Sequence, residues 1–369
     1  MSEGARIAVL LPVREALSKR RSGAVALSMR DFTAFSRYRG QTIILGALPC
    51  DLDDTPFHQL AGWRRWHLRD RIAYSRAAAA FVQDKGVALV EVQNRPTILT
   101  LLRKLLPKTK LTLYFHNDPQ EMEGTEKARG RRSVLDAADA IYCNSKFVAE
   151  RFLEGLTDPD GKVRILHYGL DTTALVPAKK EKIIAFAGRI VRDKGIVELI
   201  QAFARGASQM PDWRLAVAGE DKLGLLQSDA LKHDIAALGA RLTLLGHVDH
   251  AQTMALFARA EIASTPAIWR EPFGRTTMEA MALGCAVVSS GSGGSGEILG
   301  DCGEIVRPVT ANGLATVLVH LTQNEARRRD LQMRGAARAV AHFDIRTASA
   351  RLDDARSRLL DRQSRKAIP

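Results

Sequence analysis

Apolar and polar positions fall into two kinds of segment along the whole chain. Short apolar runs rich in β-branched residues predict buried strands. Longer runs with apolar residues three or four apart predict amphipathic helices. The predicted strands are 6–11, 42–48, 87–92, 111–115, 140–143 and 163–166 in the first half, and 183–187, 214–218, 242–245, 261–264, 286–289 and 304–306 in the second. Predicted helices fill most of the gaps, for instance 195–204, 223–238 and 252–260.

This regular alternation predicts the α/β class, with parallel sheets covered by helices on both faces. Six strands in each half predict two Rossmann-like domains in tandem. The expected division falls within 172–182, where the chain carries a proline and a basic run without clear periodicity. In open parallel sheets ligands bind outside the carboxyl ends of the strands, so candidate site residues are sought there.

Composition narrows the class of protein. A chain of 369 residues with 46% apolar and 26% charged residues is typical of a soluble globular protein with two cores. No apolar run approaches the ~20 residues of a spanning helix, and the N-terminus is interpreted as a first strand, not a signal peptide. The four cysteines lack metal or redox spacing, so we expect reduced core residues in a cytoplasmic protein. The net charge of +13 suits an anionic partner, or solubility alone.

The most informative stretch is 263–299. A short strand ends in a loop that holds Glu271, and a helix is predicted to begin after Gly274 and to end before Gly284. Gly274 allows a ligand close to the backbone, and the start of a helix offers free N–H groups and a positive dipole to an anion. Glu279 lies eight residues after Glu271. Because carboxylates accept hydrogen bonds from paired hydroxyls, the stretch predicts a site for an elongated ligand with an anion and a ribose-like diol.

Two segments resemble one known family. The run Glu-Pro-Phe-Gly-Arg-Thr-Thr-Met-Glu over 271–279, followed by Ala-Met-Ala-Leu-Gly-Cys-Ala-Val-Val, resembles the E-x7-E signature of retaining glycosyltransferases with the GT-B fold, above all family 4. The bare spacing also suits an ordinary solvated helix face, but the whole stretch is specific. The segment 186–195 is similar to the family's G-R-x-x-x-x-K-G element. Its Arg189 and Lys194 converge near a helix start, and that suits a diphosphate.

The resemblance covers nearly the full length and implies two Rossmann-like domains that face each other across a cleft, with a C-terminal helix crossing back to the first domain. Residues 1–172 with 344–369 would bind the acceptor, and 173–343 the nucleotide sugar. The catalytic residues implied are His116, Glu271, Arg189 and Lys194. In the donor, the diphosphate would be bound by Arg189 and Lys194, and the ribose by Glu279. The sugar would be bound by Glu271 and by the backbone of Phe273, Gly274, Arg275 and Thr276. The base would be bound by His247 and Val248. No metal or other cofactor is expected.

Acceptor-side candidates lie at strand ends of the first half: Gly23, Asn94, Arg95 and Asp118. Each has a plainer alternative. The basic loop before Gly23 suits a solvated surface, Pro96 enforces a turn after Arg95, and a lone histidine such as His116 is often a satisfied core group. Asp118 is not favoured as a general base. Asn144 and Ser145 are expected to cap a helix.

The segment Trp63–Tyr74 mixes aromatic and cationic residues, so it either contacts an anionic membrane surface or forms a core-packed helix. The leading hypothesis is a glycosyltransferase that moves a hexose-type sugar from a UDP- or GDP-sugar to a glycan or lipid-linked acceptor. The expected setting is lipopolysaccharide-core or other bacterial surface-polysaccharide synthesis, in the cytoplasm or at the inner membrane face.

Two alternatives stay open. One is another GT-B sugar-nucleotide enzyme, such as an epimerase, and the other is a non-catalytic Rossmann-like binding protein. A nucleic-acid partner is not expected, because the sequence has no helix-turn-helix signal or aromatic-rich strand motif. The first strand also lacks the G-x-G-x-x-G run of a dinucleotide-dependent oxidoreductase.

Overall fold

The computed structural model describes residues 6–18, 23–61 and 70–364. The chain forms two compact units. Unit 1 comprises residues 1–169 and 345–369, and unit 2 comprises Leu170–Asp344. No helix of the described residues is long and apolar enough to cross a membrane.

Unit 1 is built on a parallel sheet. Over the described residues it has seven strands in the order β3-β2-β1-β4-β5-β6-β7. Their bounds are β1 Ile7–Leu10, β2 Thr42–Gly46, β3 Phe57–Gln59, β4 Leu89–Gln93, β5 Lys110–Phe115, β6 Ala140–Cys143 and β7 Val163–Ile165. The six strands predicted for this half are confirmed. The sequence did not reveal β3, because three residues with exposed His58 and Gln59 give no apolar signal.

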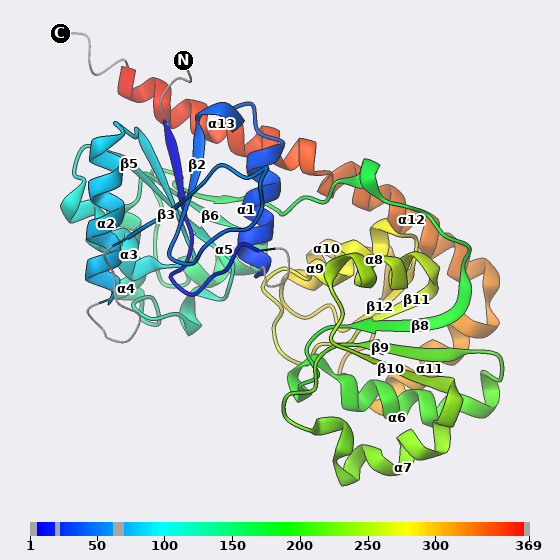
Figure 1. Ribbon diagram of the computed structural model, residues 1–369. Helices are drawn as coiled ribbons and strands as arrows, with labels where there is room; N and C mark the ends of the chain where they lie inside the picture. The colour runs from blue at the N-terminus through cyan, green and yellow to red at the C-terminus, as the bar shows by residue number, and fades with distance from the viewer. Residues whose placement is uncertain (1–5, 19–22, 62–69, 365–369) are drawn as a thin grey trace. The chain divides into compact units, whose positions relative to one another are not determined.

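Helices cover both faces of this sheet. Their bounds are α1 Ala24–Ala34, α2 Asp70–Asp84, α3 Pro96–Leu105, α4 Ala128–Ala137, α5 Lys146–Leu153 and α13 Ile345–Ser364. α2 to α5 pack on one face, and α1 and α13 pack on the other (Figure 1). Because side chains alternate along a strand, Val90 and Val92 point into the α2–α5 core, whereas Glu91 points toward α13.

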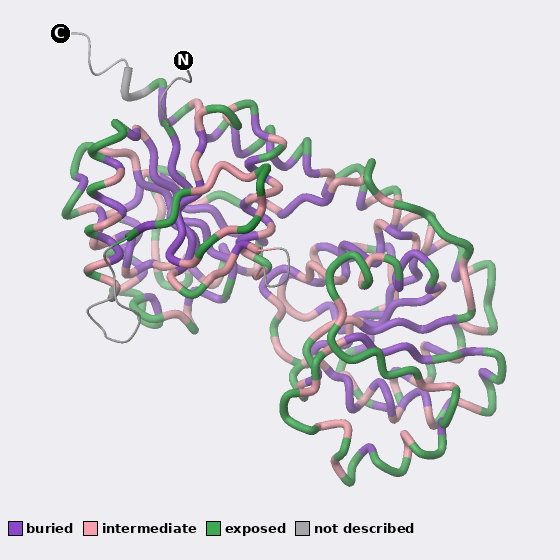
Figure 2. The backbone as a smooth tube through the Cα atoms, viewed as in Figure 1, coloured by how far each residue is buried: buried purple, intermediate pink, exposed green. Residues whose placement is uncertain are grey.

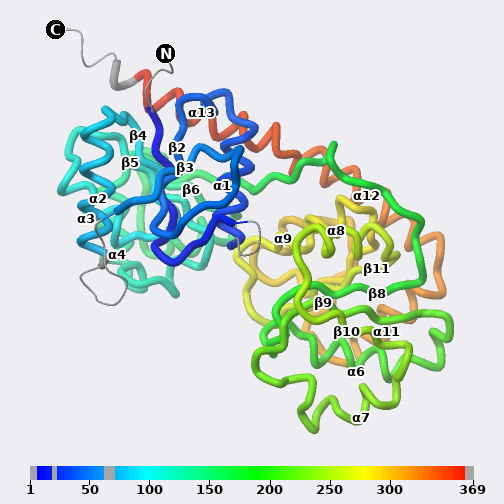
Figure 3. Tube along the Cα trace, viewed as in Figure 1, coloured from blue at the N-terminus to red at the C-terminus, as the bar shows by residue number. Residues whose placement is uncertain are grey.

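Helix α13 is part of unit 1 (Figure 3), and a buried ion cluster fastens it there. Arg356 on α13 donates to both carboxylate oxygens of Glu91, at 2.9 and 2.8 Å, and also to Asp353 and Ser36. Burial alone would lower the pKa of Arg356, but the charge and hydrogen bonds of Glu91 outweigh it and raise that pKa. The predicted C-terminal helix that returns to the first domain is therefore confirmed.

Unit 2 is a second parallel sheet, with six strands over its described residues in the order β10-β9-β8-β11-β12-β13. The strands are β8 Glu181–Ala187, β9 Arg214–Ala218, β10 Leu242–Gly246, β11 Ala260–Thr265, β12 Ala286–Ser289 and β13 Gly303–Ile305. All six were predicted. β10 at the edge is the most exposed of them (Figure 2).

The helices of unit 2 also form two layers. Their bounds are α6 Ile196–Gly206, α7 Asp229–Leu238, α8 His250–Arg259, α9 Arg275–Ala282, α10 Gly294–Leu299, α11 Ala311–Gln323 and α12 Glu325–Phe343. α6, α7 and α11 cover one face, and α8, α9, α10 and α12 cover the other (Figure 1). α8 begins two residues earlier than predicted, because Asp249 and Gln252 form a capping box at its start.

Strand order fixes where a ligand site can lie. In each sheet the first strand lies inside the sheet, and the chain adds strands on one side of it before continuing on the other. The chain therefore leads to opposite faces of the sheet after β8 and β11, which makes a topological switch point in unit 2, and it does the same after β1 and β4 in unit 1. Such points leave a crevice at the carboxyl ends of the strands.

Candidate functional site

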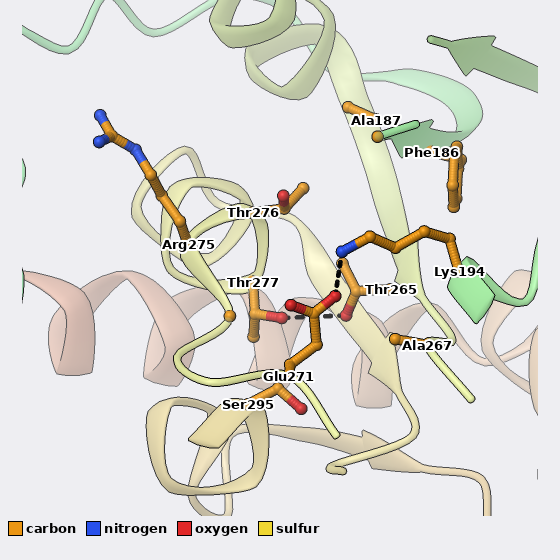
Figure 4. A pocket seen from close by; sticks show the side chains of 12 residues that line it. Phe186, Ala187, Lys194, Thr265, Ala267, Glu271, Arg275, Thr276, Thr277 and Ser295 are labelled. Carbon is orange, nitrogen blue, oxygen red and sulfur yellow. Dashed lines mark hydrogen bonds and ion pairs between the residues drawn. The ribbon is translucent and has the colours of Figure 1, made fainter. Parts of the chain in front are cut away.

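A pocket lies at the switch point of unit 2 (Figure 4). It is formed by the ends of β8 and β11, the loop after β11 and the first turn of α9. The lining residues are Phe186, Ala187, Gly188, Lys194, Thr265, Ala267, Glu271, Gly274, Arg275, Thr276, Thr277 and Ser295. Sequence reasoning named five of these as donor-binding residues, namely Lys194, Glu271, Gly274, Arg275 and Thr276.

Lys194 and Glu271 form an ion pair inside this pocket, and the Lys194 ammonium points at the Glu271 carboxylate in Figure 4. The pairing depends on contact between two loops. Gly195 adopts φ 68°, and a Cβ there would lie 2.0 Å from the carbonyl oxygen of Pro266. Asp193 O accepts a hydrogen bond from Ile268 N at 2.8 Å. Only glycine fits this conformation and approach, so the loop after β8 can lie directly against the loop after β11.

Trp269 touches both members of the pair. Its indole Nε1 donates to Glu271 Oε1 at 2.9 Å. Its ring lies beneath Lys194, whose Nζ is 5.0 Å from the ring centroid, within range of a cation–π interaction. Sequence reasoning missed this residue. A tryptophan two positions before Glu271 was visible, but an irregular loop has no periodicity that tells where its indole points.

Glu279 is held apart from Glu271 by different partners. On α9 its Oε1 accepts from Arg275 Nε at 2.8 Å and is bonded to His250 Nε2 at 2.9 Å. Burial would raise the pKa of Glu279, but the charge of Arg275 and the hydrogen bond from His250 outweigh it, and the pKa lies below its usual value. Glu279 is thus a buried carboxylate. His250, at the start of α8, is the second residue that sequence reasoning missed.

The other donor-side candidates are placed as follows. The Phe273 ring is buried and meets Phe343 edge-on, with centroids 6.2 Å apart, so only its backbone is available to a ligand. Arg189 is exposed and is not among the residues that line the pocket. His247 is exposed and Val248 half-buried in the loop between β10 and α8.

His116, at the end of β5, is buried in a polar network of unit 1. Its Nε2 lies 2.9 Å from Gln93 Oε1, and its Nδ1 is bonded to the Tyr168 hydroxyl. Because Gln93 Nε2 already donates to Glu91 O at 3.0 Å, Gln93 Oε1 accepts, so His116 carries its proton on Nε2. Burial and the charge of Arg95 lower the pKa of His116 to about 3. Both ring nitrogens of this neutral histidine are engaged with protein groups.

The acceptor-side candidates also have structural tasks. Asn94 has φ 53°, rare for a residue other than glycine, and its Oδ1 accepts from His116 N at 3.1 Å. Arg95, half-buried, donates to Asn94 O at 2.7 Å. Asp118 forms a 2.8 Å ion pair with Arg151 and accepts from Gln120 N. Gly23 precedes α1, where the Glu15 carboxylate accepts from Ala26 N.

The start of α5 shows the helix cap expected of Ser145. Ser145 caps α5 by accepting a hydrogen bond from Val148 N at 3.1 Å, as predicted.

Most of the segment Trp63–Tyr74 lies outside the described residues, as do residues 19–22. Tyr74 itself is fully buried and donates to Leu11 O at 2.9 Å, which agrees with the core-packed alternative at this end of the segment. Over the described part of the chain, no three His, Cys, Asp or Glu residues are grouped to hold a metal.

Comparison with known proteins agrees with this geometry. Residues 172–338 match the family model "Glycosyl transferases group 1", and residues 42–174 match "Glycosyltransferase Family 4". A putative glycosyltransferase of Bacillus subtilis, YtcC, is 26% identical over 253 residues, which cover 61% of this chain and 61% of that protein. The chain therefore matches less than two thirds of that relative's length.

Solved structures agree in fold. Anabaena HepE in complex with UDP superposes with a TM-score of 0.77 at 18% identity, covering 95% of this chain and 99% of HepE. WaaG, described as a glycosyltransferase involved in lipopolysaccharide biosynthesis, superposes with a TM-score of 0.68 at 14% identity, covering 95% of this chain and 99% of WaaG. Two parallel Rossmann-like sheets with a switch-point pocket define a protein of the GT-B class. The chain belongs to the glycosyltransferases of group 1 and family 4, whose two models together match residues 42–338.

Proposed function

We propose that the protein transfers a hexose-type sugar from a UDP- or GDP-sugar to a hydroxyl group of a glycan or lipid-linked acceptor, with retention of the anomeric configuration. The observation that carries this proposal is the arrangement around the switch-point pocket of unit 2. Lys194 and Glu271 meet there beside the first turn of α9, while Glu279 is held separately as a buried carboxylate.

In this proposal the leaving diphosphate binds Lys194 and the N-terminus of α9. Arg189, which follows the lining residue Gly188, is proposed to supply a second cation. As the bond between the anomeric carbon and the phosphate oxygen breaks, negative charge grows on that oxygen. Cations and helix N–H groups already in place stabilise this charge without rearrangement. The acceptor hydroxyl forms the new glycosidic bond and loses its proton to the leaving phosphate.

The remaining residues bind the donor. Glu279 accepts hydrogen bonds from the ribose hydroxyls. Glu271 accepts hydrogen bonds from the sugar, and backbone N–H groups of 273–276 donate hydrogen bonds to it. His247 and Val248 seat the base. We also propose that His116 hydrogen-bonds the transferred sugar. One of its ring nitrogens must then exchange Gln93 or Tyr168 for a sugar hydroxyl. The strand-end residues Asn94, Arg95 and Asp118, with Gly23, are proposed to lie near the acceptor.

A thermal-shift panel of UDP, GDP, ADP and their sugars tests the donor class. One selective stabiliser is the expected result, because ligand binding to the folded state raises its stability. Radiolabelled-sugar transfer then compares Lys194→Ala and Glu271→Ala with Lys182→Ala. Lys182 is an exposed lysine of β8 paired with Asp212. The two pocket variants should lose at least about tenfold in rate, as a lost charged contact implies, and Lys182→Ala should not. Wild-type rates in both pocket variants would refute the roles.

The two alternative functions, an epimerase-like enzyme and a binding protein, are distinguished by what the reaction mixture contains. An epimerase-like enzyme would return an isomerised sugar nucleotide or free sugar and would need no acceptor. A binding protein would be stabilised by nucleotide without turnover. Chromatography of the reaction mixture separates these cases from label transferred into a glycan or glycolipid.

For the acceptor we propose a sugar of lipopolysaccharide core or another bacterial surface polysaccharide, reached at the cytoplasmic membrane face. The net charge of +13 supports contact with anionic lipid. So do the tryptophans of the segment Trp63–Tyr74. Flotation with anionic liposomes, comparing the wild type with Trp63→Ala/Trp66→Ala, tests this contact, and equal flotation would remove this part of the proposal.

A further inference from the structure

We propose that Trp269 is a positioning residue for sugar transfer, because it holds Glu271 and Lys194 in their working places. This inference rests on the proposed function of the pocket. It concerns how two groups of opposite charge are kept ready for a ligand that will separate them.

The main chain around Glu271 is already fixed. Gly294 N donates to Glu271 O at 2.7 Å, and Trp269 N donates to Asp193 O at 3.3 Å. The Glu271 side chain still has several rotatable torsions, and these are set by Trp269 and Lys194. Both donors reach the same oxygen, Oε1. Neither of them occupies Oε2, so we assign Oε2 to the hydroxyl of the donor sugar.

Trp269 suits this task because it carries no charge. When a diphosphate enters, Lys194 is drawn to it, and Glu271 loses its cationic partner. The indole N–H then still holds the carboxylate. A charged residue in this place would instead compete with the diphosphate for Lys194 or with Lys194 for Glu271.

A separate observation supports a second assignment of this kind. Arg275 and His250 both contact Oε1 of Glu279, and neither occupies its Oε2. His250 is the first residue of α8 and follows the loop that carries His247 and Val248. We infer that His250 is a positioning residue for donor binding, because it ties the ribose carboxylate to the loop proposed to seat the base.

The two assignments predict different kinetic effects, so each set of variants serves as a control for the other. Trp269→Phe keeps a ring beneath Lys194 and removes the N–H donor, whereas Trp269→Leu removes both. His250→Ala removes the donor to Glu279, and His250→Gln keeps an N–H donor. Trp213→Phe is the matched control, because Trp213 is a buried tryptophan of the same unit whose ring lies under Arg328 instead.

The measurements use the full chain and the nucleotide sugar that stabilises the wild type in the panel above, with release of its nucleoside diphosphate as the readout. Trp269→Phe should lower kcat about tenfold with KM for the nucleotide sugar within about threefold, and Trp269→Leu should lower kcat further. His250→Ala should raise the KM for the nucleotide sugar about tenfold with little change in kcat. His250→Gln should bring this KM most of the way back to the wild-type value. Trp213→Phe should lower Tm and leave both constants unchanged.

An unchanged kcat in Trp269→Phe overturns the first assignment. So does a fall in kcat that Trp213→Phe shows to the same extent at a similar fall in Tm. An unchanged KM in His250→Ala, or equal effects of His250→Ala and His250→Gln, overturns the second. If the wild type binds no nucleotide sugar of the panel, the proposed function fails, and both assignments fail with it. If the wild type binds a nucleotide sugar and the variants keep the wild-type kcat and KM, the two assignments fail and the proposed function stands.

Discussion

Individual side chains in this protein owe their chemistry to neighbours that are distant in sequence. His116 is followed by Asn117 and Asp118, yet its charge state is set by burial and by Arg95, and its tautomer by Gln93 and Tyr168. Burial alone would raise the pKa of Glu279, but Arg275, one helical turn earlier, and His250, which is distant in sequence, bring that pKa below its usual value. At this scale a residue's place at a strand end or on a helix shows that it is a candidate, and its partners decide what it can do.

His116 gives a prediction about pH. Its pKa is about 3 in the folded protein and about 6.5 in the unfolded chain. Between these values the unfolded state binds a proton that the folded state does not, so stability falls as pH falls below about 6.5. At pH 5.5 this group alone should cost about 1.4 kcal/mol relative to neutral pH.

Urea unfolding at pH 7.5 and 5.5 checks this expectation for the wild type and for His116→Gln. The variant loses the network but also loses the titrating group. Its free energy of unfolding should therefore fall less between the two pH values than that of the wild type. Parallel losses in the two proteins would show that His116 does not stay neutral in the fold.

Helices and loops bring the pocket residues together through their ends. The capping box of α8 places His250 at the first helical position, where it reaches Glu279. The left-handed Gly195 lets the turn that carries Lys194 lie against Pro266. These are local features with sequence signals, but the contact between the two loops exists only because β8 and β11 are neighbours in the sheet.

Gly195 and Gly224 provide a matched test at this scale. Their φ values are nearly equal, 68° and 67°, but a Cβ on Gly195 would strike Pro266 O, whereas one on Gly224 meets nothing within 4 Å. Gly224→Ala should cost about 1 kcal/mol for the left-handed backbone alone. Gly195→Ala should cost about 1–3 kcal/mol more and should weaken nucleoside diphosphate binding, because the Lys194 turn moves. Equal costs, measured by chemical denaturation, would contradict the proposed loop contact.

At the scale of the whole molecule, the chain completes its first unit with its last helix. Unit 1 takes in residues 345–369 after the chain has passed through unit 2. The Arg356–Glu91 pair joins α13 to the middle of the sheet and is nearly free of solvent. Breaking such a pair leaves a buried charge without a partner, which costs more than the pair itself contributes.

Arg356→Leu should therefore destabilise unit 1 by about 3–5 kcal/mol. Glu91→Leu/Arg356→Leu should regain part of that loss, because position 91 then carries no charge and Asp353 keeps its hydrogen bonds from Ser36 Oγ and Arg37 N. The exposed pair Lys182–Asp212 is the control, and Lys182→Leu should change stability by less than about 1 kcal/mol. Calorimetry or urea unfolding of the four proteins measures these differences. A double variant as unstable as Arg356→Leu would show that the pair contributes through more than its charges.

The return of the last helix was implied only by the resemblance to the GT-B family. The sequence by itself determined the α/β class, twelve of the strands and the stretch around Glu271 and Glu279. These follow from local patterns: apolar runs, helical periodicity, glycines at turns and a motif with its flanking residues. It could not show β3, which is too short and too polar to leave a pattern, nor that Tyr74 is buried within unit 1.

Tertiary structure alone decided which side chains meet. The pairing of Lys194 with Glu271 links residues from two loops. The roles proposed for Trp269 and His250 depend on where an indole and an imidazole point. Strand order in the sheet brings those loops together, and strand order is not written in the spacing of apolar residues. Contacts between segments far apart in sequence therefore had to be seen in the folded chain, because a local pattern fixes an element but not its neighbours.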